Sequence, residues 1–320
     1  MATILVAFAT QDEGFELIPA GHKIIRPPHG RDFTHEELMG LLPQADVLCT
    51  SFDYQVPGDL LACGKHLRLV ANFGVGYNNI DTTFAREHCI YITNTPESVV
   101  VPTAELAFGL MLDVVRRISE LDRLVRSLPG EKPAIGRTNY LAGLLQGKTL
   151  GLLGYGNIAS ALGKRAEAFG MHIRYHKRHR YTPEEEQARG ITYASLEELL
   201  RTSDILSVHT PYSEETHHLI DAQALSLMRP DAFLINTSRG AVIDEEALVK
   251  ALQEERLAGA GLDVYEYHDV PSPLLCSLPN VVMTPHTGTQ TAETRRAMNY
   301  EMLTNVACFL RGEELPNRVV

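Results

Sequence analysis

Short apolar runs alternate with stretches of helical periodicity over the first hundred residues of the chain. The apolar runs predict strands at 3–8, 23–25, 46–50, 68–72 and 90–92. Between them, residues 34–42 show helical spacing, and Thr34 is followed three residues later by Glu37, as in a capping box at a helix start. Strands that alternate with helices in this way predict a small α/β domain with a parallel sheet.

A second alternation of helices and strands fills the rest of the chain. Pro102 opens a stretch that predicts one long amphipathic helix ending near Pro129 and Gly130, within a Gly- and Pro-containing stretch at 129–147. Further apolar runs predict strands at 149–153, 171–175, 191–193, 204–208, 232–236, 258–262 and 280–283. A final helix at 291–311 is long enough to return to the first domain.

These elements predict an α/β fold of two doubly wound parallel-sheet domains. Residues 1–101 and 291–320 would form one domain, with a dinucleotide-binding domain of residues 102–290 inserted into it. A length of 320 residues is enough for two hydrophobic cores. The two chain crossings would make a hinge, so we expect the active cleft between the domains.

A nucleotide-binding fingerprint directly follows the first strand of the second domain. Gly154 allows a tight turn from strand to helix, and Gly156 lets the backbone approach a pyrophosphate. Asn157 and Ile158 then open a helix whose first N–H groups face the negative charge. A helix stop at Gly170 and a further strand complete a βαβ unit, which favours a dinucleotide site over a plain Gly-rich turn.

The end of the second strand in this unit is basic. NAD-binding domains usually carry an acidic side chain about 20 residues after the fingerprint, where it accepts hydrogen bonds from the ribose. This chain reads HKRHR at 176–180, and Lys177 and Arg178 would pair with a 2′-phosphate that a carboxylate would repel. The sequence therefore favours NADP(H), with NAD(H) possible. A solvated strand end and a nucleic-acid patch are the alternatives.

Charge and composition exclude several classes of function. A net charge of −11 argues against a nucleic-acid or anionic-membrane surface. No apolar run approaches the roughly 18 residues of a membrane span, and the N-terminus lacks the basic lead of a signal peptide. The five scattered cysteines indicate a reducing compartment, and His217 and His218 fit a polar connection better than a metal site. We expect a soluble, cytoplasmic protein without membrane, nucleic-acid or metal partners.

Three polar side chains follow successive predicted strands of the second domain. Arg239 comes after the strand at 232–236, Asp263 follows the next strand, and His286 follows the last one. Ligands in such folds bind at the carboxyl ends of the strands, so we expect these groups at one edge of the sheet. Taken singly, Arg239 could be a surface residue in a turn and His286 a structural histidine.

The three strand-end segments, the fingerprint and the motifs at 72–81, 94–96, 103–106 and 209–211 occur together along the chain. In this order they resemble the D-isomer-specific 2-hydroxyacid dehydrogenases, most closely the glyoxylate/hydroxypyruvate reductase-like branch. The resemblance implies a Rossmann nucleotide domain inserted into a flavodoxin-like substrate domain, and a homodimer. It also implies hydride transfer between NADP(H) or NAD(H) and a small D-2-hydroxy acid/2-oxo acid pair, such as glycolate/glyoxylate or glycerate/hydroxypyruvate.

The same resemblance assigns roles to individual residues. Arg239 would pair with the substrate carboxylate and polarise the keto oxygen, because its fork of donors can hold two oxygens. His286 would donate a proton to the alkoxide during reduction and accept it back during oxidation. The backbone N–H groups of Val75 and Gly76 would hold the carboxylate from the other domain, and Asp263 would bind the nicotinamide carboxamide. Phe52 and Tyr77 would line the substrate pocket, and Thr103, Thr210, Pro211, Thr237, Ser238 and Gly288 the cofactor cleft.

One position departs from the family pattern. The family carries a Glu, paired to the catalytic His, five residues after the equivalent of Asp263, and this chain has His268 there. A carboxylate favours the charged imidazole, whereas a neutral His268 would only fix its tautomer. We therefore expect His268 as the partner and an acid limb of activity displaced to lower pH, with Glu266 or Asp269 as alternative partners. A dinucleotide-sensing protein with reduced or lost turnover and a formate dehydrogenase-like enzyme are the alternative functions.

Overall fold

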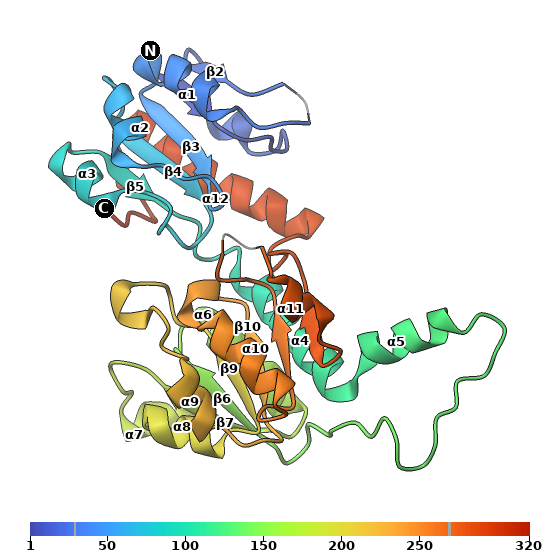
Figure 1. Cartoon of the computed structure of the whole chain (residues 1–320). Coiled ribbons are helices and arrows are strands. Elements are labelled where there is room, and N and C mark those ends of the chain that lie inside the picture. Colours follow the sequence, from blue (N-terminus) through green and yellow to red (C-terminus); the bar gives the residue numbers. More distant parts are fainter. Residues whose placement is uncertain (29, 268–269) are drawn as a thin grey trace. The chain divides into compact units, whose positions relative to one another are not determined.

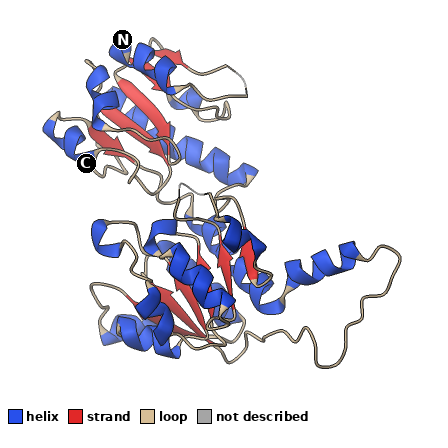
Figure 2. Ribbon diagram, viewed as in Figure 1, coloured by secondary structure: helices blue, strands red, loops and turns tan. Residues whose placement is uncertain are grey.

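The computed structural model describes residues 1–28, 30–267 and 270–320, which divide into two compact units. The first unit comprises Met1–Val99 and Thr289–Val320, and the second comprises Val100–Gly288 (Figure 1). The junctions fall two residues before those predicted, at 99/100 and 288/289. Both units are α/β, as predicted, and each is built on one parallel sheet (Figure 2).

The sheet of the first unit has the strand order β2-β1-β3-β4-β5, with every pair parallel. Its strands are β1 (Thr3–Val6), β2 (Lys23–Ile25), β3 (Val47–Ser51), β4 (Leu69–Phe73) and β5 (Tyr91–Thr93). All five predicted strands are present, and three of them begin one residue later than predicted. Non-consecutive neighbours such as β1 and β3 require crossover connections, which the intervening helices supply.

Helices cover both faces of this sheet. One face packs against α1 (His35–Leu41), α2 (Gly58–Cys63) and α3 (Thr82–Glu87), which together with the strands form a buried apolar cluster. The capping box predicted at Thr34 is present, with both reciprocal hydrogen bonds to Glu37. The short 3-10 helix η1 (Phe15–Leu17) lies between β1 and β2, and η2 (Leu42–Gln44) lies between α1 and β3.

The last helix, α12 (Ala292–Arg311), returns to the first unit and packs against β4. Asn299 is fully buried on α12 and donates from Nδ2 to the carbonyl of Gln11 at 3.2 Å. Glu301 accepts from the backbone N–H groups of Glu97 and Ser98 at 3.1 and 3.0 Å. Polar bonds therefore fix α12 to loops that lie far from it in the sequence.

The sheet of the second unit has the order β12-β11-β10-β9-β6-β7-β8, also entirely parallel. All seven predicted strands are present. They are β6 (Thr149–Leu153), β7 (His172–His176), β8 (Ile191–Tyr193), β9 (Ile205–Val208), β10 (Phe233–Asn236), β11 (Gly259–Leu262) and β12 (Val281–Met283). The order of the sheet reverses between β6 and β9, which is where open α/β sheets bind ligands.

Two apolar clusters, one on each face, hold helices to this sheet. One cluster joins α4 (Val100–Arg116) and α6 (Asn157–Ala168) to it, and the other joins α8 (Leu196–Thr202), α9 (Ala222–Leu227) and α10 (Glu245–Gln253). The remaining helical elements are α7 (Pro183–Arg189), η3 (Glu214–Thr216), η4 (Gly240–Val242) and α11 (Pro273–Ser277). Side chains of both clusters are buried almost completely, which stabilises the unit by about 1.5–3 kcal/mol for each large apolar residue.

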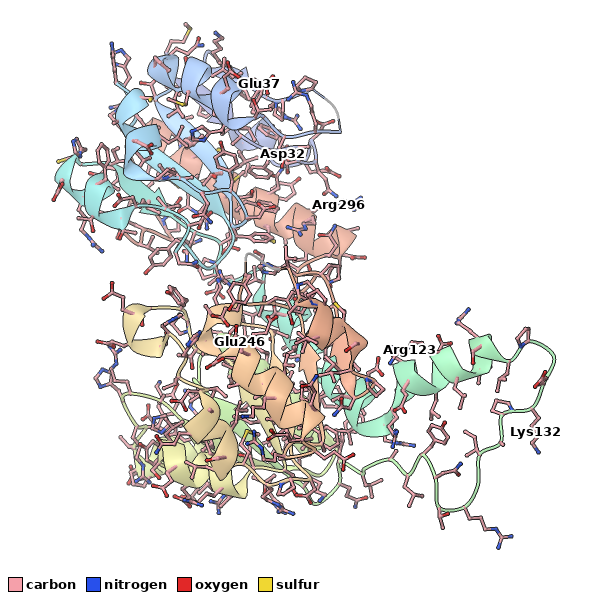
Figure 3. The ribbon with its side chains drawn as sticks, in the orientation of Figure 1. Asp32, Glu37, Arg123, Lys132, Glu246 and Arg296 are labelled. Carbon is pink, nitrogen blue, oxygen red and sulfur yellow. The ribbon has the colours of Figure 1, made fainter. Side chains whose placement is uncertain are left out.

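The single long helix predicted from Pro102 is wrong. The chain forms α4 and then α5 (Ile118–Ser127), because Arg117 adopts a left-handed backbone conformation with φ 58°. Asp113 stabilises the break by accepting hydrogen bonds from the backbone N–H and the hydroxyl of Ser119 at 2.7 and 2.5 Å. No residue of α5 is buried, and the helix extends away from the sheet of its own unit, as the labelled Arg123 and Lys132 show (Figure 3).

Among the described residues, no helix combines the length and the apolar character that a membrane crossing requires.

Candidate functional site

The three strand-end groups of the second unit lie at neighbouring strands, as predicted. Arg239, Asp263 and His286 follow β10, β11 and β12, which are adjacent in the sheet. Backbone hydrogen bonds continue beyond the strand ends, from the N–H of Asp263 to the carbonyl of Asn236 at 2.9 Å and from the N–H of His286 to the carbonyl of Asp263 at 2.9 Å. The residues that carry the guanidinium, the carboxylate and the imidazole therefore all follow strands that end at the same edge of the sheet.

Asp263 fixes the loop that carries His286. Its side chain is 1 % exposed, and its carboxylate accepts from the Thr284 hydroxyl at 2.6 Å, the Thr287 N–H at 2.8 Å and the Gly288 N–H at 2.9 Å. His286 itself has φ 52°, a left-handed conformation that costs about 1–2 kcal/mol in an ordinary residue. The bonds to Asp263 hold the backbone in this conformation.

Thr103 and Gly288 lie beside the same carboxylate. A Cβ atom on Gly288 would approach Asp263 Oδ2 to 3.3 Å and Thr103 Oγ1 to 3.4 Å, so the glycine allows the loop to pass close to α4. Of the residues predicted for the cofactor cleft, Gly288 thus contacts Asp263 and Thr103 lies close to Gly288. The carboxylate oxygen Oδ2 accepts one hydrogen bond from the described residues and retains capacity for another.

Arg239 belongs to a tight turn after β10. The side chain of the buried Asn236 stabilises this turn by hydrogen bonds. Its Nδ2 donates to the Arg239 carbonyl at 3.0 Å, and its Oδ1 accepts from the N–H and the hydroxyl of Ser238. The Thr237 hydroxyl is buried and has no hydrogen-bond partner among the described residues. Because buried hydroxyls are usually satisfied, Thr237 is suited to bind a ligand group.

The fingerprint turn between β6 and α6 has the geometry expected of a pyrophosphate site. Gly154 has φ 85°, and a Cβ atom there would lie 2.9 Å from the backbone of His209. A Cβ atom on Gly156 would meet nothing within 4 Å, so this glycine faces open space. The backbone N–H groups of 155–159 have no acceptor in the part of the chain that the structure describes. A dinucleotide therefore fits these residues.

Two further residues of the predicted cofactor cleft follow β9. The Thr210 hydroxyl donates to the carbonyl of Leu153 at 3.2 Å, which places it beside the end of β6, and Pro211 is exposed next to it. His209 donates its N–H to the same carbonyl, and its ring nitrogen lies 2.9 Å from the Ser207 hydroxyl. Burial of the ring lowers the pKa of His209 to about 4.

The three Lys and Arg side chains of the basic strand end make different contacts. Arg180 forms two hydrogen bonds to Glu186, at 2.7 and 3.0 Å, and this lowers the pKa of that buried carboxyl. Lys177 instead lies 4.0 Å from the centre of the Tyr181 ring. Arg178 is exposed and paired with Glu215, so the guanidinium predicted to bind a 2′-phosphate is in contact with a carboxylate of this chain.

In the first unit, buried asparagines hold the loop that contains Val75 and Gly76. Asn72 donates to the carbonyls of Gly74 and Gly76 at 3.1 and 2.8 Å, and Asn94 donates to the carbonyl of Val75 at 2.8 Å. The N–H groups of Val75 and Gly76 have no acceptor among the described residues. With its carbonyls bound by amides and these N–H groups available, the loop is suited to bind an anion.

The other two residues predicted for the substrate pocket flank this loop. A Cβ atom on Gly74 would approach the Phe52 Cβ to 2.9 Å, and Tyr77 is an exposed residue of the loop itself. The guanidinium of Arg295 on α12 lies 5.7 Å from the Phe52 ring and 5.5 Å from the Phe73 ring. Neither Arg295 nor the asparagines are among the predicted site residues, although Asn72 and Asn94 each open one of the motifs that carry the resemblance.

His268 and Asp269, two of the three residues considered as partners of His286, lie outside the described residues. The third, Glu266, contacts other groups. Its Oε1 lies 2.7 Å from His218 Nε2, and its Oε2 accepts from the N–H of Glu245 at 3.0 Å. The interpretation of His218 as part of a simple polar connection is therefore incomplete.

Comparison with known proteins agrees with this geometry. Residues 108–288 match the family model described as D-isomer specific 2-hydroxyacid dehydrogenase, NAD binding domain. A glyoxylate reductase of Thermococcus litoralis is 44 % identical over 295 residues, which cover 92 % of this chain and 87 % of that protein.

Solved structures give the same result. A glyoxylate reductase of Paecilomyes thermophila superposes with a TM-score of 0.89 at 32 % identity, covering 99 % of this chain and 98 % of that one. An NADPH-dependent glyoxylate/hydroxypyruvate reductase of Sinorhizobium meliloti, solved with NADP and malonate, has a TM-score of 0.87 at 31 % identity, with 100 % and 97 % covered. The chain therefore belongs to the D-isomer-specific 2-hydroxyacid dehydrogenase family, in its glyoxylate reductase branch, and is an oxidoreductase that uses a nicotinamide dinucleotide.

Proposed function

We propose that this protein reduces short 2-oxo acids, glyoxylate or hydroxypyruvate among them, to D-2-hydroxy acids. The observation that carries the proposal is the placement of Arg239, Asp263 and His286 at three adjoining strand ends, with the His286 loop fixed by Asp263. The relatives named glyoxylate reductase support the choice of substrate class.

In this proposal the chain's own groups bind the substrate and move a proton. The Arg239 guanidinium pairs with the substrate carboxylate and polarises the keto oxygen. The N–H groups of Val75 and Gly76 bind an oxygen of the same carboxylate, while Phe52 and Tyr77 limit the size of the substrate. His286 donates the proton that the substrate oxygen takes up on reduction. The bound dinucleotide supplies the hydride.

The residues that would hold the dinucleotide come from six segments of the second unit. Gly154, Gly156, Asn157 and Ile158 would bind the pyrophosphate through the start of α6. The carboxamide would bind to Asp263, whose Oδ2 has capacity for a further donor. The remaining contacts would come from Thr103, Thr210, Pro211, Thr237, Ser238 and Gly288.

We further propose a preference for NADPH over NADH. Lys177 and Arg178 are the cations available at the end of β7, and no carboxylate lies among residues 176–180. The Sinorhizobium meliloti relative solved with NADP supports this assignment. A 2′-phosphate carries more charge than the Glu215 carboxylate and would displace it from Arg178.

The partner of His286 is proposed to be His268. Without a carboxylate at this position the protonated form of the catalytic imidazole is less favoured, so reduction should be confined to a lower pH range than with a Glu. Substituting His268→Glu and measuring kcat/KM for reduction against pH tests this. A profile that moves to higher pH is expected, and an unchanged profile would show that His268 is not the partner.

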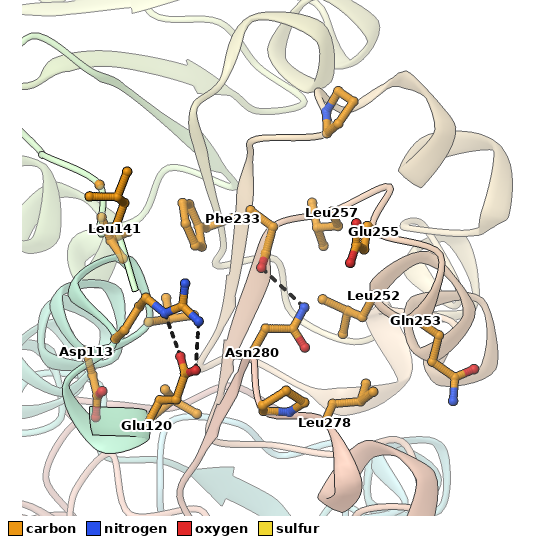
Figure 4. A pocket seen from close by; sticks show the side chains of 18 residues that line it. Asp113, Glu120, Leu141, Phe233, Leu252, Gln253, Glu255, Leu257, Leu278 and Asn280 are labelled. Carbon is orange, nitrogen blue, oxygen red and sulfur yellow. Dashed lines mark hydrogen bonds and ion pairs between the residues drawn. The ribbon is translucent and has the colours of Figure 1, made fainter. Parts of the chain in front are cut away.

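We propose that the protein is a cytoplasmic homodimer. The five free cysteines suit a reducing compartment. The segment 118–147, which we call the arm, exposes several large apolar side chains: Ile118, Val125, Ile135, Leu141 and Leu144. A hollow of about 700 Å³ lies at the base of the arm, lined by Leu141, Phe233, Leu252 and Asn280 among others (Figure 4). A second copy that covers the arm would remove this apolar surface from water.

The function is tested by following NADPH oxidation with glyoxylate, hydroxypyruvate and pyruvate as substrates. We expect turnover by the wild type, a loss of about 10²-fold or more in kcat/KM for Arg239→Lys, and a loss of about 10²–10⁴-fold for His286→Gln. Dinucleotide binding without oxidation in the wild type would instead favour a sensor, and oxidation of formate would favour the formate dehydrogenase-like alternative.

A further inference from the structure

Glu245, Glu266 and His218 form a cluster outside the proposed catalytic groups, and nothing in the reaction requires it. We propose that these three residues, here called the clamp, are positioning residues that hold the Arg239 turn in place. The inference rests on the proposed function, because it assumes that Arg239 binds the substrate.

The two glutamates exchange hydrogen bonds with each other's backbone. The N–H of Glu266 donates to Glu245 Oε2 at 3.1 Å, and the N–H of Glu245 donates to Glu266 Oε2 at 3.0 Å. Glu245 Oε1 also accepts from the N–H of Ser272 at 3.0 Å. Glu266 and Ser272 are thus both attached to the first residue of α10.

His218 closes the cluster from a third segment. Its Nε2 lies 2.7 Å from Glu266 Oε1, and its backbone N–H donates to the carbonyl of Ala241 at 2.9 Å. Its φ of 50° places the residue in the left-handed region, so its backbone is held in an unfavourable conformation while it makes these two contacts. His218 therefore binds the turn after Arg239 through its backbone and Glu266 through its ring.

The clamp is in direct contact with the Arg239 turn. A Cβ atom on Gly240 would lie 1.9 Å from the carbonyl carbon and oxygen of Tyr265 and 2.4 Å from the N of Glu266. The backbone after Arg239 therefore lies against the backbone of 265–266 without space for a side chain. If Glu266 moves, the carbonyl of Tyr265 and the turn of Arg239 must move with it.

Burying the carboxylates of this cluster costs too much free energy for the cluster to be an incidental surface contact. Glu245 is 5 % exposed, and the Glu266 side chain is 11 % exposed. Neither carboxylate forms an ion pair with a Lys or Arg among the described residues, and the His218 ring is the one described side chain within ion-pair distance of Glu266. The start of α10 and the backbone N–H groups add favourable partial charges. Two buried carboxylates are expensive, and here the cost serves to fix the position of three loops.

The chain offers a matched control in the neighbouring residue. His217 is exposed and stacks on His218 with ring centres 3.9 Å apart, and among the described residues it is His218 that bonds to Glu266. His218→Asn shortens the side chain while keeping a residue that tolerates a left-handed backbone. His217→Asn makes the same chemical change next to the clamp.

The test compares His218→Asn, Glu266→Gln and His217→Asn by two readouts. The first is hydrogen exchange of the backbone amides of Glu245, Glu266 and Ser272 in the protein without substrate. We expect these amides to exchange at least tenfold faster in His218→Asn and Glu266→Gln and at the wild-type rate in His217→Asn. The second is steady-state reduction of glyoxylate. We expect KM for glyoxylate to rise about five- to twentyfold in the clamp variants, with KM for NADPH changed less than twofold.

The outcomes separate the clamp from the proposed function. Unchanged exchange in His218→Asn overturns the clamp, whether or not the protein turns over glyoxylate. Faster exchange with an unchanged KM for glyoxylate shows that the cluster does not position Arg239 and also overturns the proposal. If the wild type fails to reduce any oxo acid, the proposed function fails, while the exchange rates still report on the clamp. Should Glu266→Gln fail to fold, the His218 and His217 variants decide the question.

Discussion

Gly154 and Gly156 are needed for different reasons in the turn between β6 and α6. Gly154 has a left-handed backbone and faces the His209 backbone at close range, whereas Gly156 faces open space. The first glycine is required by the fold, and the second is required by the ligand.

A pair of alanine substitutions should separate these two requirements. We expect Gly154→Ala to lower the free energy of unfolding by about 1–3 kcal/mol, because it adds both strain and a clash. Gly156→Ala should leave the free energy of unfolding within about 0.5 kcal/mol of wild type but weaken NADPH binding tenfold or more, because its Cβ would occupy the path of the pyrophosphate. Urea unfolding and NADPH titration measure the two effects. Equal loss of stability in both variants would contradict the distinction.

Glu215 should limit the preference for NADPH. Its carboxylate pairs with Arg178, and both side chains are mostly exposed. We expect Glu215→Gln to raise the ratio of kcat/KM for NADPH to that for NADH about two- to fivefold, the range typical of an exposed ion pair. Glu214→Gln changes the neighbouring exposed carboxylate and is the control. If both variants shift the ratio equally, the effect is one of net charge and not of the Arg178 pair.

The sequence predicts the chemical groups of the site better than the residues that hold them. Arg239, Asp263 and His286 can be found because each directly follows an apolar strand. The contacts of His218 with Glu266, and of Asn94 with the loop at Val75, join residues 48 and 19 positions apart. No local pattern marks such contacts, so they require the fold.

At the scale of elements, the hydrophobic pattern locates strands more precisely than helix breaks. All seven predicted strands of the second unit are present; β9 and β11 are buried along their whole length, whereas β7 alternates between buried and less buried residues. The break between α4 and α5 is absent from the pattern, because it depends on the left-handed Arg117 and on the bonds from Ser119 to Asp113. Both are tertiary or side-chain details that periodicity does not record.

The junction of β6 and β9 should make stability depend on pH through His209. Burial lowers the pKa of this imidazole to about 4, against about 6.5 in an unfolded chain, so the unfolded state binds the proton first as the pH falls. The contribution of His209 to the free energy of unfolding is fully present above pH 6.5. It declines as the pH falls towards 4, by at most about 3 kcal/mol. Urea unfolding at several pH values should show a shallower decline for His209→Gln than for wild type. His172→Gln alters an exposed imidazole and should follow the wild type; an identical decline in the His209 variant would rule out this assignment.

At the scale of the whole molecule, the arm is the feature that a monomer does not explain. Leu141 and Leu144 are 70 % and 63 % exposed, which is unfavourable for two neighbouring large apolar residues unless another surface covers them.

Charged substitutions in the arm should therefore weaken the proposed dimer. We expect Leu141→Glu combined with Leu144→Glu to raise the dissociation constant at least tenfold, because the dimer would bury two carboxylates in an apolar contact. Light scattering over a dilution series measures the average molar mass of the protein and hence the dissociation constant of the dimer. Met39→Glu, which alters an exposed apolar residue of α1, should leave the mass unchanged. A wild type that is monomeric at all concentrations would refute the dimer directly.

The split of the first unit along the chain has a consequence for how the protein is made. Its sheet and first three helices are complete by Val99, but α12, which packs on β4, follows only after the whole second unit, Val100–Gly288. At about 5–20 residues per second, a ribosome needs about 10–40 s to synthesise that interval. During this time the side of β4 that α12 covers stays uncovered, so the first unit cannot complete its fold until α12 has been synthesised.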